Sequence, residues 1–208
     1  MVEIVRCEDF GPATKLLPTL TRTAPDQRIF VVDDDRIYHA NLVEDLVSGI
    51  RKWPEKALGF SGWVVPDDFI DRPTTILSNL FMRPPAPIRC TRLSKPCPID
   101  VLQGLSGYCV QPSFFPGNDV MTDYSKAPKA AFYVDDVWIS AHCKADKIVI
   151  PAQKANFQPK SLASFYGQNS LGKINRGLGG FENRNNSIMI KHFKDKWRIG
   201  GYQRHKNK

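Results

Sequence analysis

The sequence has no long apolar run and no leader-like start. None of its apolar stretches approaches the roughly 20 residues that a helix needs to cross a bilayer. The start, Met1–Arg6, lacks the charged head and apolar stretch of a signal peptide. From these features we expect neither a transmembrane segment nor an export signal.

Paired cysteines are also missing. The five cysteines are odd in number, scattered and never spaced as CxxC, and only Cys90 and Cys97 are close in sequence. This pattern predicts buried thiols rather than a disulfide framework or a zinc site. We therefore expect a reducing compartment, with the cytoplasm favoured.

Acidic residues are scarce toward the C-terminus. Residues 151–208 contain twelve lysines and arginines against Glu182 and Asp195, a balance of +10, whereas residues 1–150 carry −2. Such asymmetry favours an anionic partner, for example a nucleic acid, a phosphorylated substrate or a membrane surface. Charge alone does not choose among these partners.

What is present is the pattern of one α/β domain over residues 1–208. Apolar runs rich in β-branched residues alternate with amphipathic segments, which predicts a mostly parallel sheet flanked by helices. The proline-rich residues 66–97 predict an irregular excursion with one short helix near Thr74–Phe81. We expect strands at Met1–Arg6, Arg28–Val32, Leu58–Val65, Ile99–Gly104, Gly107–Gln111, Phe132–Val134 and Lys147–Ile150, and further helices over 13–17, 40–52, 135–145 and 186–196.

Three aspartates follow the predicted strand Arg28–Val32. Asp33, Asp34 and Asp35 come where open α/β sheets bind ligands, in the crevice beyond the strand ends. Adjacent carboxylates suit a hard divalent cation such as Mg²⁺ or Mn²⁺, which also bridges to substrate phosphates. The alternative is a polar turn that caps the following helix.

A second acidic pair, Asp135 and Asp136, stands between Phe132–Val134 and a predicted helix. One carboxylate could cap that helix while the other projects into the same crevice. There it would act as a general base and take a proton from an acceptor hydroxyl. Plain helix capping is the alternative for both.

These segments resemble a known family. Phe30–Asp35 resembles the DxD motif of GT-A fold glycosyltransferases, and Val134–Ser140 resembles their later acidic motif at the head of a helix. The segment Arg6–Leu16, with the sequence Gly-Pro-Ala-Thr-Lys at its centre, is similar to glycosyltransferase domains of the kind found in a large chlorella virus, where they help to glycosylate the capsid. The resemblance covers about residues 4–150 and implies a GT-A-like (Rossmann-like) fold.

The resemblance implies an inverting, metal-dependent glycosyltransferase of the hexosyltransferase kind. It would move a sugar from a nucleoside diphosphate sugar, with a UDP-sugar favoured, to a hydroxyl of a glycan or glycoprotein. It assigns Mn²⁺ or Mg²⁺ to Asp35, with Asp33 as a further metal ligand, and donor contact to Asp33 or Asp34. Asp136, or its neighbour Asp135, is the implied base, and we prefer Asp136.

Further donor contacts are expected around the predicted helix start and a glycine-rich loop. Asp9 and Lys15 belong to the matching N-terminal segment, and Lys15 could reach a phosphate or the ribose. In Gln103–Gly107, glycine would let the backbone approach a ligand closely. The alternatives are a solvated lysine and a tight hairpin turn, and the candidates in the loop are Gly104, Ser106 and Gly107.

The basic segment Ser161–Asn186 would close over the donor, and Lys173, Arg176 and Arg184 are candidates for binding its diphosphate. A solvated basic tail is the alternative. Outside this segment, Trp63 could stack on a sugar ring, although tryptophan is more often buried in a core. His192 could complete the metal shell, although a lone histidine on a basic helix is more often exposed.

On this interpretation residues 1–65 bind the donor, residues 66–150 form the acceptor-side and catalytic part, and residues 151–208 form a basic lid or tail. GT-A domains open with a strand and helix ahead of the unit seen here. Either the chain lacks that first unit or its nucleoside pocket is built differently.

Two other classes of protein stay open. A metal-dependent phosphoesterase or nucleotidyltransferase would also use aspartates at strand ends. A basic nucleic-acid-binding module is disfavoured, because residues 151–208 contain no recognisable recognition motif.

Overall fold

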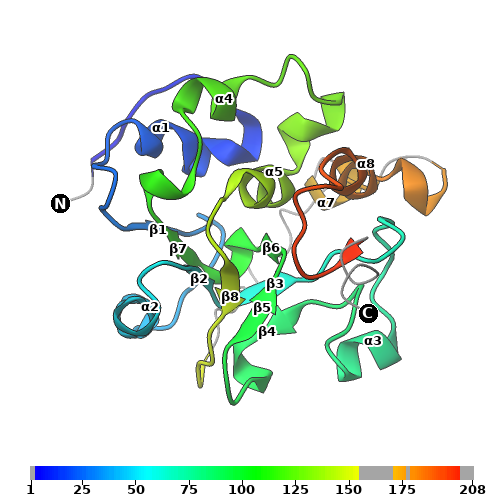
Figure 1. Ribbon diagram of the computed structural model, residues 1–208, viewed down its shortest axis with the longest axis horizontal. Coiled ribbons are helices and arrows are strands. Elements are labelled where there is room, and N and C mark those ends of the chain that lie inside the picture. The colour runs from blue at the N-terminus through cyan, green and yellow to red at the C-terminus, as the bar shows by residue number, and fades with distance from the viewer. Residues whose placement is uncertain (1–2, 155–170, 177–178, 202–208) are drawn as a thin grey trace.

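The computed structural model describes residues 3–154, 171–176 and 179–201 and has an α/β fold with two sheets (Figure 1). The larger sheet has five strands in the order β1-β7-β2-β8-β5, and the smaller has three in the order β4-β3-β6. The strands are β1 (Ile29–Val31), β2 (Ala57–Gly59), β3 (Ser61–Trp63), β4 (Ile88–Arg89), β5 (Cys97–Ile99), β6 (Val101–Leu102), β7 (Tyr108–Val110) and β8 (Lys147–Val149).

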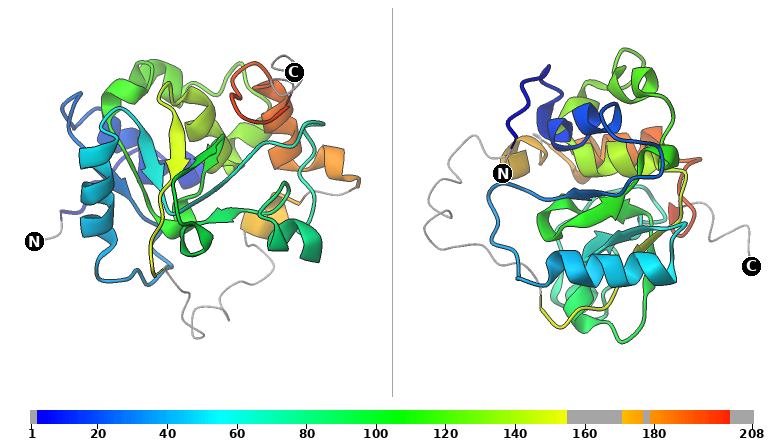
Figure 2. Two further views of the ribbon diagram at one scale, coloured as in Figure 1. Left: turned by 60° about the horizontal axis from the view of Figure 1, so that its bottom comes forward. Right: turned by 90° about the vertical axis from the view of Figure 1, so that its left-hand side faces the viewer.

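Helices cover both faces of the five-stranded sheet. The helix α2 (Leu42–Lys52) lies on one face, and α1 (Leu17–Leu20), α4 (Asn118–Thr122) and α5 (Asp135–His142) lie on the other (Figures 1 and 2). The remaining helices are α3 (Ile76–Leu80), α7 (Leu171–Ile174) and α8 (Asn185–His192), and the 3₁₀ helices are η1 (Gly11–Lys15), η2 (Cys90–Arg92), η3 (Gly104–Ser106), η4 (Pro112–Phe114), η5 (Lys129–Tyr133) and η6 (Phe181–Asn183).

The larger sheet is mixed, so the expectation of a mostly parallel sheet is wrong. Within the described residues, β2 and β8 are the one parallel pair, while β7 pairs antiparallel with both β1 and β2, and β5 pairs antiparallel with β8. Apolar runs of three residues do not encode strand direction, which the connections decide. The strands β1, β2 and β8 still point the same way, because β7 is antiparallel to both of its neighbours.

Several predicted strands are also corrected. Residues 3–6 form no strand and are exposed, because no neighbouring strand pairs with them. The run Leu58–Val65 divides at Phe60, so that β2 and β3 belong to different sheets. Ile99–Gly104 divides in the same way at Asp100. Phe132–Val134 is not a strand either, since Pro128 starts the 3₁₀ helix η5 there.

The helix α2 confirms the amphipathic pattern that predicted it. Leu42 and Leu46 are buried against the sheet. Glu44 and Asp45 lie in its first turn and its last two residues are basic, so both ends suit the helix dipole. Among the described residues, no helix is both long and apolar enough to span a membrane.

The C-terminal part of the described chain is built into the core. Met189, Ile190 and Trp197 are each at most 1% exposed and join the one cluster that begins at Ala13. The buried carboxylate of Asp100 anchors the last described residues to the rest of the fold. It accepts four backbone hydrogen bonds of 2.8–3.0 Å, from the N–H groups of Val65, Arg198, Ile199 and Gly200.

Candidate functional site

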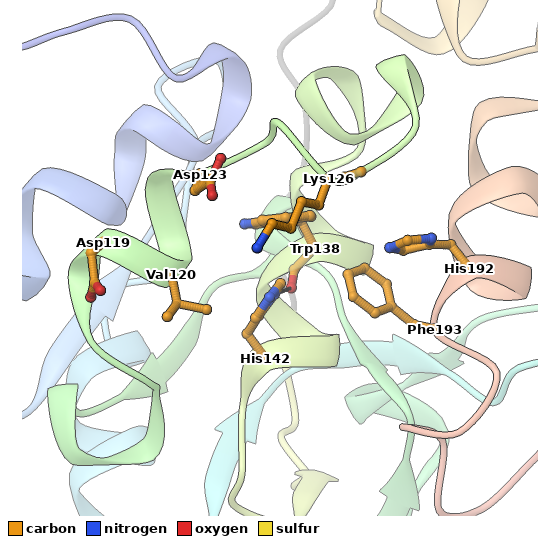
Figure 3. A pocket seen from close by; sticks show the side chains of 9 residues that line it. Asp119, Val120, Asp123, Lys126, Trp138, His142, His192 and Phe193 are labelled. Atoms are coloured by element: carbon orange, nitrogen blue, oxygen red, sulfur yellow. Dashed lines mark hydrogen bonds between the residues drawn. The ribbon is translucent and has the colours of Figure 1, made fainter.

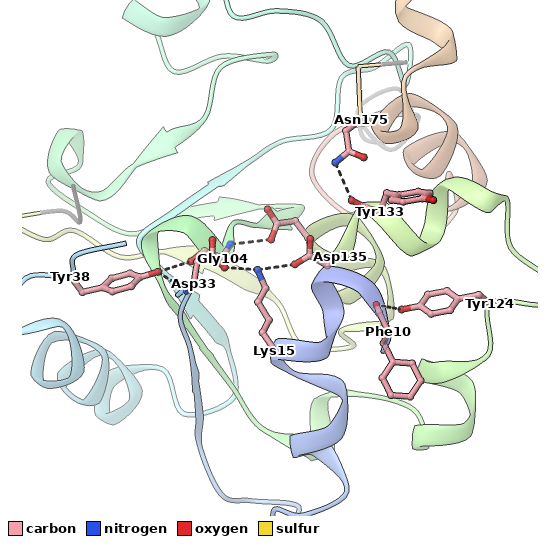
Figure 4. A network of polar contacts seen from close by, with 10 residues as sticks. Phe10, Lys15, Asp33, Tyr38, Gly104, Tyr124, Tyr133, Asp135 and Asn175 are labelled. Carbon is pink, nitrogen blue, oxygen red and sulfur yellow. Dashed lines mark hydrogen bonds and ion pairs between the residues drawn. The ribbon is translucent and has the colours of Figure 1, made fainter. Parts of the chain in front are cut away.

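Lys15 joins the two acidic segments. Its Nζ lies 2.7 Å from Asp33 Oδ1, beyond the end of β1, and 2.8 Å from Asp135 Oδ2, at the start of α5 (Figure 4). Between 13% and 23% of each of these side chains is exposed. Lys15 is therefore not a solvated lysine but the counter-ion of an acidic cluster.

The Gly11–Lys15 segment has a local reason to place this lysine. Gly11 has φ +62°, and a Cβ there would lie 2.4 Å from the carbonyl oxygen of Phe132. Pro12 is the second residue of the 3₁₀ helix η1, and Ala13 packs into the core. The segment thus packs closely against the residues that lead into α5, and Lys15 follows at its end.

Asp135 and Asp136 are the first two residues of α5, and neither caps it, since the N-cap is Val134 without a side-chain cap. Asp136 Oδ1 instead accepts the backbone N–H of Gly104 at 3.0 Å. This bond ties the start of α5 to the loop after β6. The capping alternative for this pair is therefore wrong.

Gly104 stands where side chains of the cluster pack closely. A Cβ at this position would lie 2.4 Å from Lys15 Nζ and 3.0 Å from Asp33 Oδ1. The groups that approach this glycine in the structure are side chains of the cluster, and close approach to a ligand stays a prediction. Lys15, Asp33, Gly104 and Asp135 thus meet in one place, as Figure 4 shows. Asp136 joins them through its hydrogen bond with Gly104.

Two tyrosines of this site were missed by sequence reasoning. The hydroxyl of Tyr38 accepts the backbone N–H of Asp33 at 2.8 Å and donates to Gly104 O at 3.4 Å. Tyr108, on β7, is 1% exposed, and its hydroxyl has no hydrogen-bond partner among the described residues. No sequence signal marked either tyrosine, because each reaches the site through the fold.

The cluster shifts the pKa values of Lys15 and Asp136. Burial by itself would lower the pKa of Lys15, but the carboxylates of Asp136, Asp135 and Asp33 outweigh it, and the pKa is raised. Burial, reinforced by the charge of Asp135, raises the pKa of Asp136 to about 7. At neutral pH the site therefore combines a firmly charged lysine with a carboxyl close to its titration point.

The other aspartates have different surroundings. Asp34 is exposed in the turn after β1. The side chain of Asp35 is 42% exposed and lies 3.5 Å from Arg36 Nε. Asp9, which we expected at the donor, is exposed and accepts the N–H of Gly11 at 2.8 Å, which stabilises the local turn.

Among the described residues, no three histidine, cysteine, aspartate or glutamate side chains are grouped to hold a metal ion. A cation held by one or two carboxylates and completed by substrate phosphates does not need such a group. The accessible carboxylate of Asp35 fits this arrangement. Asp33 fits it less well, because Lys15 already occupies its Oδ1.

The end of the glycine-rich loop forms a tight turn. Gly107 has φ +84°, and its N–H donates to Gly104 O at 2.9 Å. Ser106 is 6% exposed. Ser106 and Gly107 therefore form a tight turn, which was the alternative to ligand contact for this loop. Gly104 belongs to the charged cluster.

A pocket of about 580 Å³ opens beside this loop. Gln103, which precedes Gly104, lines it together with Trp63, Arg176 and Arg184. Arg184 is 3.8 Å from Asp71, whereas Arg176 has no ion-pair partner among the described residues. The side chain of Lys173 and residues 161–170 and 177–178 of the proposed closing segment lie outside the described residues.

His192 lies elsewhere. It stands beside Phe193 and lines a pocket of about 400 Å³ together with His142 and Asp119 (Figure 3). Trp138 of α5 forms part of the same wall. The structure therefore does not place His192 with Asp35, as completing the metal shell would require.

Comparison with models of known protein families gave no match, and comparison with curated proteins gave none either. The functional argument therefore rests on the geometry of the described residues.

Proposed function

We propose that this protein is an inverting glycosyltransferase that uses a divalent metal and a nucleoside diphosphate sugar. The observation that carries the proposal is the meeting of Lys15, Asp33, Gly104 and Asp136 from four separate segments. The strands β1, β2 and β8 point the same way, which supports a ligand crevice at their carboxyl ends.

Asp136 is the proposed general base. Its Oδ1 accepts the N–H of Gly104, so Oδ2 is the oxygen that would take a proton from an acceptor. A carboxylate held in this way can accept the proton of an acceptor hydroxyl as that oxygen attacks the anomeric carbon. Its raised pKa, near the working pH, favours both the uptake and the release of the proton.

Asp35 is the proposed metal ligand, and the donor diphosphate would complete the coordination of Mn²⁺ or Mg²⁺. When bound, the ion supplies positive charge that stabilises the departing nucleoside diphosphate. Asp33 is held by Lys15 and Tyr38, so we assign it to donor contact. Lys15 keeps its charge because of the surrounding carboxylates and orients Asp33 and Asp135.

The pocket beside Gly104 supports the binding of a sugar phosphate. Trp63 offers an aromatic ring for stacking, and the guanidinium of Arg176 can form paired hydrogen bonds with phosphate oxygens. Gln103 links this pocket to the loop that holds Asp136.

The proposal is tested by calorimetric screening of nucleoside diphosphate sugars with Mn²⁺, followed by assays of nucleoside diphosphate release. Asp35→Asn should abolish metal-dependent release, and Asp136→Asn should retain donor binding but lose transfer. Asp26→Asn, on an exposed turn, is the matched control and should leave both unchanged.

Three other results would change the assignment of the base, of the metal ligand or of the reaction. If Asp135→Asn rather than Asp136→Asn loses transfer, the base is the neighbouring aspartate. Unchanged turnover in Asp35→Asn would remove the metal assignment. Phosphate release or nucleotide transfer without any sugar donor would instead establish the phosphoesterase or nucleotidyltransferase alternative.

A further inference from the structure

The short helix α3 lies at the periphery of the molecule (Figure 1). It presents apolar side chains to solvent. Ile76 is 88% exposed, Leu77 68%, Leu80 65% and Phe81 61%. Single exposed apolar residues are common on protein surfaces, but four large ones within six positions form a contiguous patch. Folding of the described chain does not bury this patch.

Polar contacts fix α3 in this orientation. Thr75 and Ser78 form a reciprocal capping box at its start, and Ser78 is buried. At its end, the N–H of Arg83 donates to Ser78 O at 3.0 Å, and the guanidinium of Arg92 donates to Asn79 O. Hydrogen bonds therefore fix both ends of the helix that carries the apolar side chains.

Basic residues predominate in the segment that carries the patch. Asp67 and Asp68 line a pocket together with Arg83, but residues 72–99 contain five basic residues and no acidic one. Two of them border the patch directly. The Arg83 guanidinium lies 6.0 Å from the centre of the Phe81 ring, and Arg92 is bonded to the last turn of α3. Neither arginine has an ion-pair partner among the described residues.

We propose that α3, with Arg83 and Arg92, docks this protein onto the surface of an anionic lipid bilayer. The apolar side chains would enter the boundary between headgroups and acyl chains, and the two guanidinium groups would meet lipid phosphates. A stable protein interface needs about 800 Å² per partner, far more than three side chains of α3 and the neighbouring Phe81 provide. A bilayer needs no such area, because lipid surrounds each apolar side chain that enters it.

This inference does not depend on the proposed catalytic activity. The test is flotation of the full chain with vesicles of phosphatidylcholine alone and of phosphatidylcholine mixed with phosphatidylserine, at low and high salt. We expect binding to the mixed vesicles that weakens with salt. The double change Leu77→Ser/Phe81→Ser should weaken it by roughly a hundredfold, and Arg83→Gln/Arg92→Gln by roughly tenfold or more.

Matched controls lie on α2. Val43→Ser removes an apolar side chain that is 52% exposed, and Arg51→Gln/Lys52→Gln removes two charges from exposed positions. Both should bind vesicles like the parent protein. Thermal unfolding of every variant checks that the fold is retained.

Four results would overturn the proposal. One is failure of the parent protein to bind mixed vesicles, and another is equal binding to vesicles of phosphatidylcholine alone. Binding that persists in the α3 variants would assign membrane contact to another basic surface. A dimer that Leu77→Ser/Phe81→Ser dissolves, without vesicle binding, would make the occupant a second copy of the chain.

Discussion

Replacement of Asp136 by asparagine should stabilise the folded protein at alkaline pH while it removes the proposed base. The asparagine amide oxygen can still accept the N–H of Gly104, so the change removes charge and keeps the contact. Burial and the charge of Asp135 raise the pKa of Asp136 from 3.8 to about 7. The pKa of this carboxyl is higher in the folded protein than in the unfolded one. Its contribution to the stability of the folded state is therefore fully present at a pH below the pKa in the unfolded protein. The contribution is lost as the pH rises through about 7.

The magnitude follows from this shift. Each pKa unit corresponds to about 1.4 kcal/mol, so ionisation of this carboxyl costs the folded state up to about 4 kcal/mol at about pH 8. Asp136→Asn removes that cost. The difference in unfolding free energy between variant and parent should therefore grow in favour of the variant between about pH 5 and pH 8.

Urea unfolding in the presence of a chelator, repeated across this pH range, measures the difference without interference from metal ions. Asp26→Asn, which removes an exposed carboxylate, should stay within about 0.5 kcal/mol of the parent at every pH. If Asp136→Asn is less stable than the parent at about pH 8, or if its difference does not change with pH, Asp136 is not a destabilised carboxyl. The argument for it as a base poised near neutrality would then fail.

Three further predictions concern other parts of the fold. Asp100→Asn disturbs a carboxylate that accepts four backbone N–H groups and should cost about 3 kcal/mol in urea unfolding. Burial lowers the pKa of Lys147, so its ammonium destabilises the folded state most at low pH. Lys147→Met should raise the melting temperature at about pH 7, and this gain should shrink as the pH rises toward 10. Gly104→Ala places a Cβ against the flexible end of Lys15, so it should cost less than about 1 kcal/mol in stability but reduce turnover by about tenfold or more.

The site was partly predictable because its residues carry local signals. A buried run that ends in aspartate predicted β1 and Asp33. An acidic pair before an amphipathic segment predicted α5 and its first residues. Glycine marked the position that the ends of two side chains approach closely, at Gly104.

Other parts of the site were not predictable from local pattern. Tyr38 and Tyr108 lie at the cluster because β7 and the turn after β1 are neighbours in space. His192 is exposed, as its basic surroundings indicated, on a helix that Met189 and Ile190 anchor, and it lines a different pocket. The place of each of these residues depends on contacts between segments far apart in the chain.

The sequence by itself determined the α/β class, the main helices, and the two acidic segments with the lysine that belongs to them, because hydrophobic period, glycine and proline act over a few residues. The tertiary structure decided the direction and order of the strands, the exposure of α3, and the role of Lys15 as the cation between Asp33 and Asp135. These features depend on which distant segments pack together, and no short stretch of sequence specifies that.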